Sequence, residues 1–389
     1  MRHRHALAAA VLLCCGTGPA LAAVAEKSLD EAARAVAPRV VEWRRDLHQN
    51  PELGNREFRT SKLVAAHLKS LGLEVRTDIA HTGVVGILKG GRPGPTIALR
   101  ADMDALPVTE RVDVPFKSTV TTEYRGEKVG VMHACGHDGH TAILMGAAEV
   151  LAARRSELPG TVLFIFQPAE EGAPEGEQGG APLMLREGVF GDPKPEAIFG
   201  LHLWSALNAG QIGYRQGSIM AAADSFRIVV NGRQTHGSRP WGGVDPIVAA
   251  AQIVSDMQTV VSRQTDITSW PAVVSVGAIK GGIRMNIIPD SVEMLGTIRT
   301  FDPAVRESVI EKMRRVAEHV AAANGATATL EILPGSTPVL VNTPDLTQRM
   351  LPSLERAAGE GNVVEIPYVI GAEDYAYFAL EVPSVYFFV

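Results

Sequence analysis

Thr161-Val-Leu-Phe-Ile-Phe166 runs directly into Gln167-Pro-Ala-Glu-Glu171, and this stretch decides the fold. A continuous apolar run of this length is typical of a strand that is buried on both faces of a sheet. Similar runs lie at residues 96–100 and 197–201, and segments with helical spacing separate them. This alternation predicts an α/β fold whose mostly parallel sheet is covered by helices on both faces.

The pattern of continuous apolar runs separated by helical segments changes near residue 222. Ser225-Phe-Arg-Ile-Val-Val230 alternates between polar and apolar residues, as a strand with one buried face does. Two helices and three further strands follow, in the order β-α-β-β-α-β of a ferredoxin-like module. They are expected over residues 246–263 and 303–324 for the helices, and near Val273, near Ser291 and over 326–332 for the strands.

Buried-strand patterns return over residues 363–370 and 384–389, so the module is predicted to be inserted into the larger domain. The expected domains are the first part of the larger domain over 23–221, an inserted lid or dimerisation domain over 222–332, and the second part of the larger domain over 333–389. Helices are also expected near the start, over residues 29–48 and 56–71. A further helix over residues 142–151 is expected to be capped by Asp138.

The first 22 residues have the pattern of an export signal. Arg2 and Arg4 precede an apolar run, and a small-x-small site ends at Ala22. The run is too short to span a bilayer. We therefore expect a signal peptide over residues 1–22 and an exported, periplasmic protein. An uncleaved anchor or a wrongly assigned start is the alternative.

The length of the chain indicates how many domains it has, and its net charge indicates which kinds of partner it can bind. A chain of 389 residues usually needs more than one hydrophobic core, which agrees with two domains. The formal net charge is -6, and the acidic residues are spread along the chain. Neither a nucleic acid nor a membrane surface is expected as a partner, because nothing in this pattern would attract an anionic surface.

Cys135 would be the only cysteine of the processed chain, so an internal disulfide is excluded and redox chemistry or metal binding remains. It lies in His133-Ala-Cys-Gly-His-Asp-Gly-His140. A thiolate two residues from an imidazole is a natural ligand pair for a divalent transition metal. Such a pair shares one side only in irregular chain, and Gly136 allows the bend. A local zinc site is the alternative, although four ligands in so short a stretch would strain a tetrahedron. Its ligands would be His133, Cys135, His137 and His140.

Polar residues follow the ends of four predicted strands. In open α/β sheets ligands bind outside the carboxyl ends of the strands, so these side chains should converge. Each residue alone could be a turn, cap or structural residue, but their shared placement favours a site. The strand-end residues are Asp102 and Asp104, Glu170 and Glu171, His202, and Glu373 and Asp374.

Six motifs in order resemble the amidohydrolases of the aminoacylase/carboxypeptidase superfamily, and most closely its hippurate hydrolase, N-acyl-amino-acid amidohydrolase and auxin-conjugate hydrolase branch. The resemblance runs from about residue 30 to the end of the chain. The motifs are Arg100-Ala-Asp-Met-Asp-Ala-Leu-Pro107, His133-Ala-Cys-Gly-His-Asp-Gly-His-Thr-Ala142, Gln167-Pro-Ala-Glu-Glu171, Gly200-Leu-His202, Asn286-Ile-Ile-Pro-Asp290 and Gly371-Ala-Glu-Asp-Tyr375.

The resemblance implies two divalent metal ions per subunit, Mn²⁺ or Zn²⁺, with Ni²⁺ or Co²⁺ also possible. It makes Glu170 the general base and Asp104 the acid that orients a ligating imidazole. Asp102 stands where other branches carry a ligand histidine. The implied reaction is hydrolysis of an N-acyl amino acid by metal-activated water. A dipeptidase or carboxypeptidase acting on a dipeptide is the alternative. The implied metal ligands are Cys135, His137, Glu171 and His202.

In the inserted module, His236 matches a family histidine that reaches a neighbouring subunit's active site and steadies the oxyanion. An exposed loop histidine is the alternative. Asn286 and Arg299 match positions that hold the substrate carboxylate, for which an arginine fork is suited. Arg299 could instead pair with a neighbouring acid. The resemblance therefore implies a homodimer or a higher homo-oligomer.

Relatives in the resembled family continue for a few dozen residues beyond a motif like Pro383-Ser-Val-Tyr-Phe-Phe-Val389, and supply one more ligand histidine. The expectation is that this sequence is a fragment of a longer enzyme, with a stretch of sheet left exposed. The competing hypothesis is a truncated, catalytically impaired metal-binding remnant.

Overall fold

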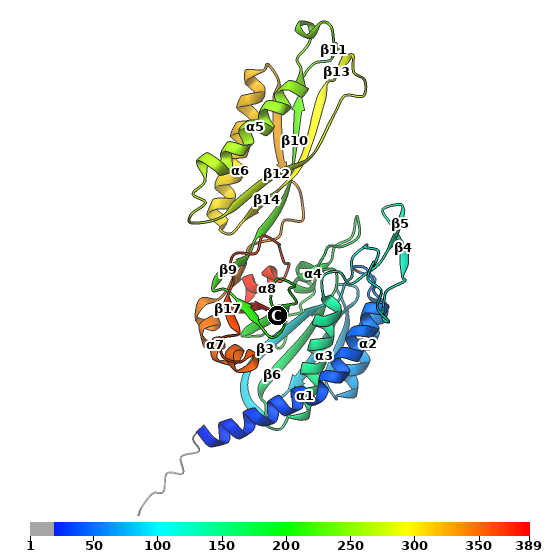
Figure 1. Cartoon of the computed structure of the whole chain (residues 1–389), viewed down its shortest axis with the longest axis vertical. Coiled ribbons are helices and arrows are strands. Elements are labelled where there is room, and N and C mark those ends of the chain that lie inside the picture. The colour runs from blue at the N-terminus through cyan, green and yellow to red at the C-terminus, as the bar shows by residue number, and fades with distance from the viewer. Residues whose placement is uncertain (1–18) are drawn as a thin grey trace, which may run out of the picture.

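The computed structural model describes residues 19–389, with side chains from residue 29 onward. It has two parts, a larger α/β domain that contains the end of the chain and an elongated second domain that projects from it (Figure 1). The predicted signal peptide over residues 1–22 lies almost entirely outside the described residues. No helix in the described part of the chain is long and apolar enough to cross a membrane.

The larger domain is built on an eight-stranded sheet in the order β1-β2-β6-β3-β7-β18-β8-β17. Its centre, β6-β3-β7-β18, is parallel, whereas β1-β2, β2-β6 and β18-β8 are antiparallel. The predicted fold class is confirmed. The strands are β1 (Glu74–Ile79), β2 (Gly83–Lys89), β3 (Arg92–Asp102), β6 (Pro159–Gln167), β7 (Ala197–His202), β8 (Ile212–Tyr214), β17 (Val363–Glu365) and β18 (Ser384–Phe388).

The sequence of β6 explains its central place. Successive side chains of a strand point to opposite faces. Phe164 and Phe166 accordingly pack with residues of helices α2 (Phe58–Ser70) and α3 (His137–Ala153). Leu163 and Ile165 pack on the other face, with residues of α4 (Gly180–Arg186) and α8 (Ala376–Glu381). Both faces of the sheet are covered at this strand, and its run of apolar residues is therefore unbroken. Helix α1 (Pro19–Gln49) lies against α3.

The inserted domain has the predicted order of elements. Its four strands form one antiparallel sheet in the order β12-β14-β10-β15, with α5 and α6 on one face. This is the ferredoxin-like order, because the two outer strands are the second and the fourth in sequence. The elements are β10 (Ala222–Asn231), α5 (Pro246–Gln264), β12 (Ala272–Gly281), β14 (Ser291–Thr300), α6 (Pro303–Ala323) and β15 (Thr327–Ile332).

Short elements complete the chain. A two-stranded ribbon of β11 and β13 lies at the end of the inserted domain that is farthest from the large sheet (Figure 1). The hairpin β4-β5 projects from the larger domain (Figure 1). The bounds are β4 (Thr121–Tyr124), β5 (Glu127–Gly130), β9 (Gly217–Met220), β11 (Thr235–His236), β13 (Ile287–Ile288), β16 (Leu340–Asn342), α7 (Pro344–Ala358) and the 3₁₀ turn Pro240–Gly242.

Two local expectations are wrong. Helix α3 begins at His137 after Gly136, so Asp138 lies inside the first turn and its carboxylate accepts a hydrogen bond from His48 instead of capping the helix. The strand expected over residues 363–370 ends at Glu365. Pro367 lacks the N–H that a longer strand would need, which accounts for the early end.

Candidate metal centre

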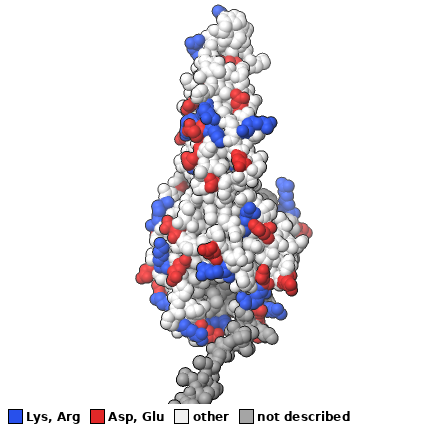
Figure 2. Space-filling view, turned by 90° about the vertical axis from the view of Figure 1, so that its left-hand side faces the viewer, with Lys and Arg blue, Asp and Glu red and all other residues white. Residues whose placement is uncertain are grey.

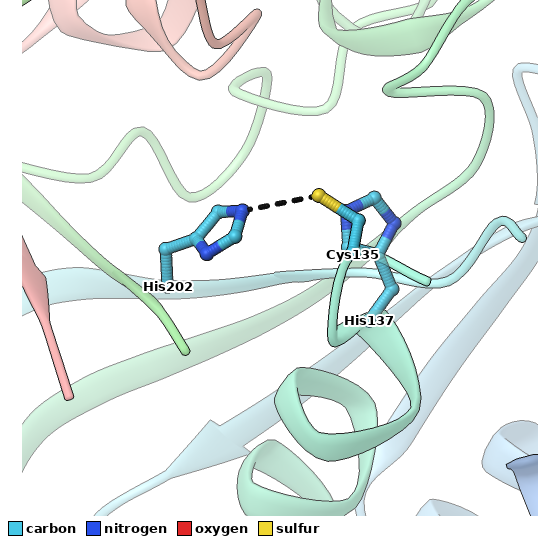
Figure 3. A group of neighbouring side chains, drawn as sticks. All are labelled: Cys135, His137 and His202. Atoms are coloured by element: carbon cyan, nitrogen blue, oxygen red, sulfur yellow. Dashed lines mark hydrogen bonds between the residues drawn. The ribbon is translucent and has the colours of Figure 1, made fainter. Parts of the chain in front are cut away.

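The ends of two parallel strands and the start of α3 bring a thiol, two imidazoles and two carboxylates together. His202 is the last residue of β7, Glu170 and Glu171 follow β6, and Cys135 lies just before α3. The Sγ atom of Cys135 is 3.4 Å from Nε2 of His202, and the ring of His137 lies on the other side of the thiol (Figure 3). The predicted convergence at the carboxyl edge of the sheet is present in the structure.

His137 is held by one ring nitrogen and leaves the other free. Its Nδ1 is 3.3 Å from a carboxylate oxygen of Asp104, while its buried Nε2 has no hydrogen-bond partner and lies 3.9 Å from Glu170. Burial alone would lower the pKa of His137, but the carboxylates of Asp102 and Asp104 outweigh it and hold the pKa well above its usual range. The surroundings thus favour a positive charge at this ring, and a divalent cation can take the place of the proton.

His202 is oriented in the same way by the backbone. Its Nδ1 donates to the carbonyl oxygen of Leu203 at 2.6 Å, which leaves Nε2 directed at Cys135. A ligating histidine usually donates its second ring N–H to a carboxylate or a carbonyl, because this fixes the tautomer. Both His137 and His202 therefore have the orientation of metal ligands.

Four groups of side chains in the described part of the chain could hold a cation, and the two that include the predicted ligands Cys135 or Glu171 share His137. In each group the potential ligand atoms all lie within 4.8 Å of one another. The unpartnered Nε2 of His137 and the mixed sulfur, nitrogen and oxygen donors fit divalent transition metals. These two groups are Cys135, His137 and His202, and His137, Glu170 and Glu171.

Glu170 is a member of the second group and also lies next to a further pair of acids, Glu373 and Asp374. Its Oε1 accepts a hydrogen bond of 3.3 Å from the backbone N–H of Asp374. Burial, followed by the charges of Glu373 and Asp374, raises the pKa of Glu170 well above its usual range. Burial also raises the pKa of Glu171. A carboxyl group in this setting binds a proton readily, which suits acid–base work.

The local zinc site considered from the sequence is not formed. Both ring nitrogens of His140 are occupied, Nδ1 by Asp102 at 2.6 Å and Nε2 by the backbone N–H of Leu203 at 2.8 Å. His133 is buried and belongs to none of the groups that could hold a cation, and burial lowers its pKa to about 4. Asp102 therefore orients His140, which in turn holds the chain next to His202.

Sequence reasoning missed the arginine beneath the site. Arg100, at the end of β3, is fully buried and contacts three carboxylates. Its Nη1 lies 2.6 Å from Asp102, and its Nη2 lies 3.0 Å from Glu373 and 3.1 Å from Asp374. A charged residue that ends an otherwise apolar strand was the available signal, because a buried arginine must find anions.

The residues predicted in the inserted domain lie in two places. His236 and Asn286 are neighbours in the exposed ribbon, where Gly237 donates to the carbonyl oxygen of Asn286 at 2.8 Å. Arg299 lies near the other end of β14, is half-buried and donates to the carbonyl oxygen of Ile298. It forms no ion pair with any residue in the described part of the chain. Within one chain, the structure does not bring His236 or Asn286 to the metal centre (Figure 1).

A parallel-sheet domain with these donors at its strand ends, together with an inserted ferredoxin-like domain, defines a metal-dependent hydrolase. The chain belongs to peptidase family M20/M25/M40, whose family model matches residues 98–389. This confirms the resemblance described above.

Relatives of this chain are named as carboxypeptidases and as deacetylases. The chain is 42% identical to thermostable carboxypeptidase 2 of Saccharolobus solfataricus over 350 residues, covering 90% of this chain and 85% of the relative. It is 45% identical to N-acetylcysteine deacetylase of Bacillus subtilis over 303 residues, covering 77% and 75%. The crystal structure of Bacillus subtilis YXEP, described as a dinuclear metal-binding peptidase of family M20, matches with a TM-score of 0.77 and 38% identity, covering 91% of this chain and 89% of that one.

Proposed function

We propose that this chain hydrolyses the amide bond between an acyl group and the nitrogen of an amino acid. The proposal rests mainly on the position of Glu170, a carboxyl group with a raised pKa. Its Oε2 lies 3.9 Å from Nε2 of His137, which has no hydrogen-bond partner. Names of relatives support the reaction type, among them N-acetylcysteine deacetylase and IAA-amino acid hydrolase ILR1-like 2 of Arabidopsis thaliana, 40% identical over 357 residues.

Two divalent ions, Mn²⁺ or Zn²⁺, would be held by Cys135, His137, Glu171 and His202. The description of the YXEP structure as dinuclear supports the number of ions. When bound, such ions lower the pKa of a water molecule and polarise the scissile carbonyl.

Glu170 then accepts the proton of the attacking water and transfers it to the leaving amine nitrogen. Asp104 accepts from Nδ1 of His137 and keeps Nε2 of that ring turned to the ions. The two neighbouring acids thus have different roles. Glu171 binds metal, and Glu170 stays free to carry a proton.

The inserted domain would complete the site from a second subunit. His236 is exposed, and its Nδ1 lies 2.8 Å from the Ser238 hydroxyl, so the ring is oriented at the surface of the ribbon. We infer that this histidine steadies the oxyanion in a neighbouring subunit, with Asn286 and Arg299 holding the substrate carboxylate. This proposal requires a homodimer or a higher homo-oligomer, which analytical ultracentrifugation can measure.

A carboxypeptidase acting on dipeptides is the second candidate, because two carboxypeptidases of Saccharolobus solfataricus are at least 40% identical to the chain. The two functions differ in the group next to the scissile carbonyl. An N-acetyl amino acid has no free α-amino group, whereas a dipeptide has one. Their relative kcat/KM values on the same C-terminal residue decide between them.

Glu170→Gln tests the assignment of the base. We expect turnover to fall by about 10²–10⁴-fold, because the amide cannot accept the proton of water. Metal content, measured by mass spectrometry of the purified protein, should stay nearly unchanged. The comparison variant His202→Ala should lose metal as well as activity. Full activity of Glu170→Gln would show that another group is the base.

We further propose that the chain is exported to the periplasm and processed after Ala22. The basic, apolar and small-residue regions at its start support this. N-terminal sequencing of the protein recovered from a periplasmic extract should begin at Ala23, and recovery of the intact start from the cytosol would contradict it.

A further inference from the structure

Glu57 is a fully buried acid at the start of α2 that has no part in the proposed reaction so far. Its side chain does not cap the helix that it precedes. Glu52 does so instead, because its two carboxylate oxygens accept from the backbone N–H groups of Arg59 and Thr60 at 2.9 and 2.8 Å. Burying an acid costs free energy unless it is hydrogen-bonded, so the partners of Glu57 show what it does.

The carboxyl group of Glu57 contacts the turn that carries Glu170. Its Oε1 accepts a hydrogen bond of 2.9 Å from the backbone N–H of Ala169, the residue directly before Glu170. Its Oε2 accepts a hydrogen bond of 2.5 Å from the hydroxyl of Thr82. Ala169 is buried as well, so a loss of the Glu57 acceptor would leave a buried N–H group unsatisfied.

The backbone of this turn needs support from its surroundings. Ala169 has a φ of +50°, a left-handed conformation that a residue with a Cβ atom rarely adopts. Such a conformation persists only where neighbouring groups hold it. The segment before α2 packs directly on it, since a Cβ atom added to Gly54 would lie 3.1 Å from Cβ of Ala169. The hydrogen bond from Glu57 comes from the same segment.

Glu170 thus lies between two backbone N–H groups that are each held by a carboxyl group. On one side, Ala169 donates to Glu57. On the other side, the N–H of Glu171 donates to Oδ2 of Asp104 at 3.0 Å. Asp104 also orients a candidate ligand, whereas the contact made by Glu57 acts on the residue next to the proposed base.

We propose that Glu57 is a positioning residue for the general base and that it fixes Glu170 through the backbone of Ala169. The inference rests on the proposed role of Glu170 in amide hydrolysis. A group that transfers a proton must lie within hydrogen-bond reach of the atom that gives or takes it. A displacement of about 1 Å can therefore lower the rate by about 10²-fold.

The first test replaces Glu57 in the full chain loaded with Mn²⁺, with N-acetyl-alanine as the substrate. Glu57→Leu removes the acceptor and keeps most of the buried volume. We expect kcat to fall by about 10²-fold. KM should stay within about twofold of its wild-type value, because Glu57 is not expected to touch the substrate.

Glu57→Gln is the conservative variant and should restore kcat. Its amide oxygen can accept from the N–H of Ala169, and its NH₂ group can donate to the hydroxyl of Thr82. Burial, followed by the charge of Asp104, raises the pKa of Glu57 to about 8, so a neutral side chain suits this place at neutral pH. An equal fall of kcat in both variants would overturn the proposal, because the hydrogen bond to Ala169 would then not be what matters.

Glu52→Ala is the matched control for stability. It removes the cap of the same helix and leaves the hydrogen bond between Glu57 and Ala169 in place. Its free energy of unfolding should fall while kcat stays unchanged. A fall of kcat as large as that of Glu57→Leu would show that general loosening of α2 is the cause and would overturn the positioning role.

Hydrogen exchange separates failure of the positioning role from failure of the reaction. The N–H of Ala169 should exchange faster in Glu57→Leu than in the wild-type chain or Glu57→Gln, as measured by mass spectrometry of peptides that cover residues 167–172. Unchanged kcat in Glu57→Leu, with activity lost in Glu170→Gln, would overturn the positioning role alone. Faster exchange in Glu57→Leu, without hydrolysis by the wild-type chain, would support the hold of Glu57 on the turn and overturn the proposed reaction.

Discussion

Helix α3 of the larger domain and the two helices of the inserted domain begin in different ways. In the inserted domain, α5 and α6 start at Asp245-Pro246 and Asp302-Pro303, and each aspartate accepts hydrogen bonds from two backbone N–H groups. In the larger domain, α3 follows Gly136, which has a φ of +96°, and no side chain caps it. Cys135 and His137, on either side of this glycine, are candidate ligands. The start of α3 is built for binding, and the starts of α5 and α6 for stability.

Buried charge shows the same contrast. Beneath the metal centre the Arg100 side chain has no exposed surface and faces three carboxylates. In the inserted domain the main ion pair, Arg306 with Asp224, leaves 27% of the arginine side chain exposed. Concentrating several charges in one buried place costs stability unless every partner is present. The two domains therefore predict different responses to similar substitutions.

Arg100→Met should give the largest effect on stability. It leaves Asp102, Glu373 and Asp374 without their cation, and removal of one partner from a buried ion network typically costs about 3–5 kcal/mol. Urea unfolding of the metal-free protein measures this loss.

The loss caused by Arg100→Met should also depend on pH. Burial raises the pKa of Asp374 to about 7, even though Arg100 lowers it. Without the arginine, the pKa of Asp374 in the folded state rises further above its unfolded value, so the stability of the variant falls as pH rises through that window. The difference in free energy of unfolding between the wild-type chain and Arg100→Met should be larger at pH 8 than at pH 5.

Arg306→Met is the matched comparison. It leaves one buried carboxylate, that of Asp224, without its cation, where Arg100→Met leaves three, and about 1–3 kcal/mol is expected. Equal losses in the two variants would contradict the contrast between the domains.

The sequence predicted what depends on periodicity and local chemistry. The unbroken apolar run of β6 indicated a strand buried on both faces, and the alternation in Ser225–Val230 indicated a sheet covered on one face. The aspartate–proline pairs before α5 and α6 are local signals of a helix start. The convergence of His202 with Glu170 and Glu171 followed from the rule that sites form at the carboxyl ends of strands. The ligand set that adds Cys135 and His137 followed from the family resemblance.

The remaining features depend on contacts that no local pattern carries. Arg100 and Glu373 are 273 residues apart, and their pairing exists only once β3 and the segment before α8 are packed together. The position of Asp138 in the sequence predicts a helix cap, yet Nδ1 of His48 in α1 lies 2.8 Å from its Oδ2. Tertiary packing thus overrode a local preference that is worth only about 1 kcal/mol.

Gly136→Ala tests whether the start of α3 is specialised for ligands. A Cβ atom at this position would lie 3.2 Å from Cβ of Leu203, in a left-handed backbone conformation. Leu203 adjoins His202, so we expect Zn²⁺ affinity to fall by about 10–100-fold. Gly325→Ala after α6 is the control, because it has a φ of +71° and nothing within 4 Å of the new atom. Gly325→Ala introduces only the conformational cost of an alanine in a left-handed backbone conformation, and it should leave the metal affinity unchanged.

Asp302→Ala should give the smallest effect and should confine it to the inserted domain. The carboxylate accepts from the N–H groups of Ala304 and Val305, both at 2.9 Å, and loss of such a cap costs about 1 kcal/mol. Asp302→Asn keeps a side-chain oxygen that can accept these hydrogen bonds, so its free energy of unfolding should fall by only a few tenths of that amount. Unfolding followed by fluorescence, in a background that keeps Trp270 as the single tryptophan, should shift while Zn²⁺ affinity stays unchanged. A change in Zn²⁺ affinity would mean that the two domains are coupled, so that stability in the inserted domain is not independent of the metal centre.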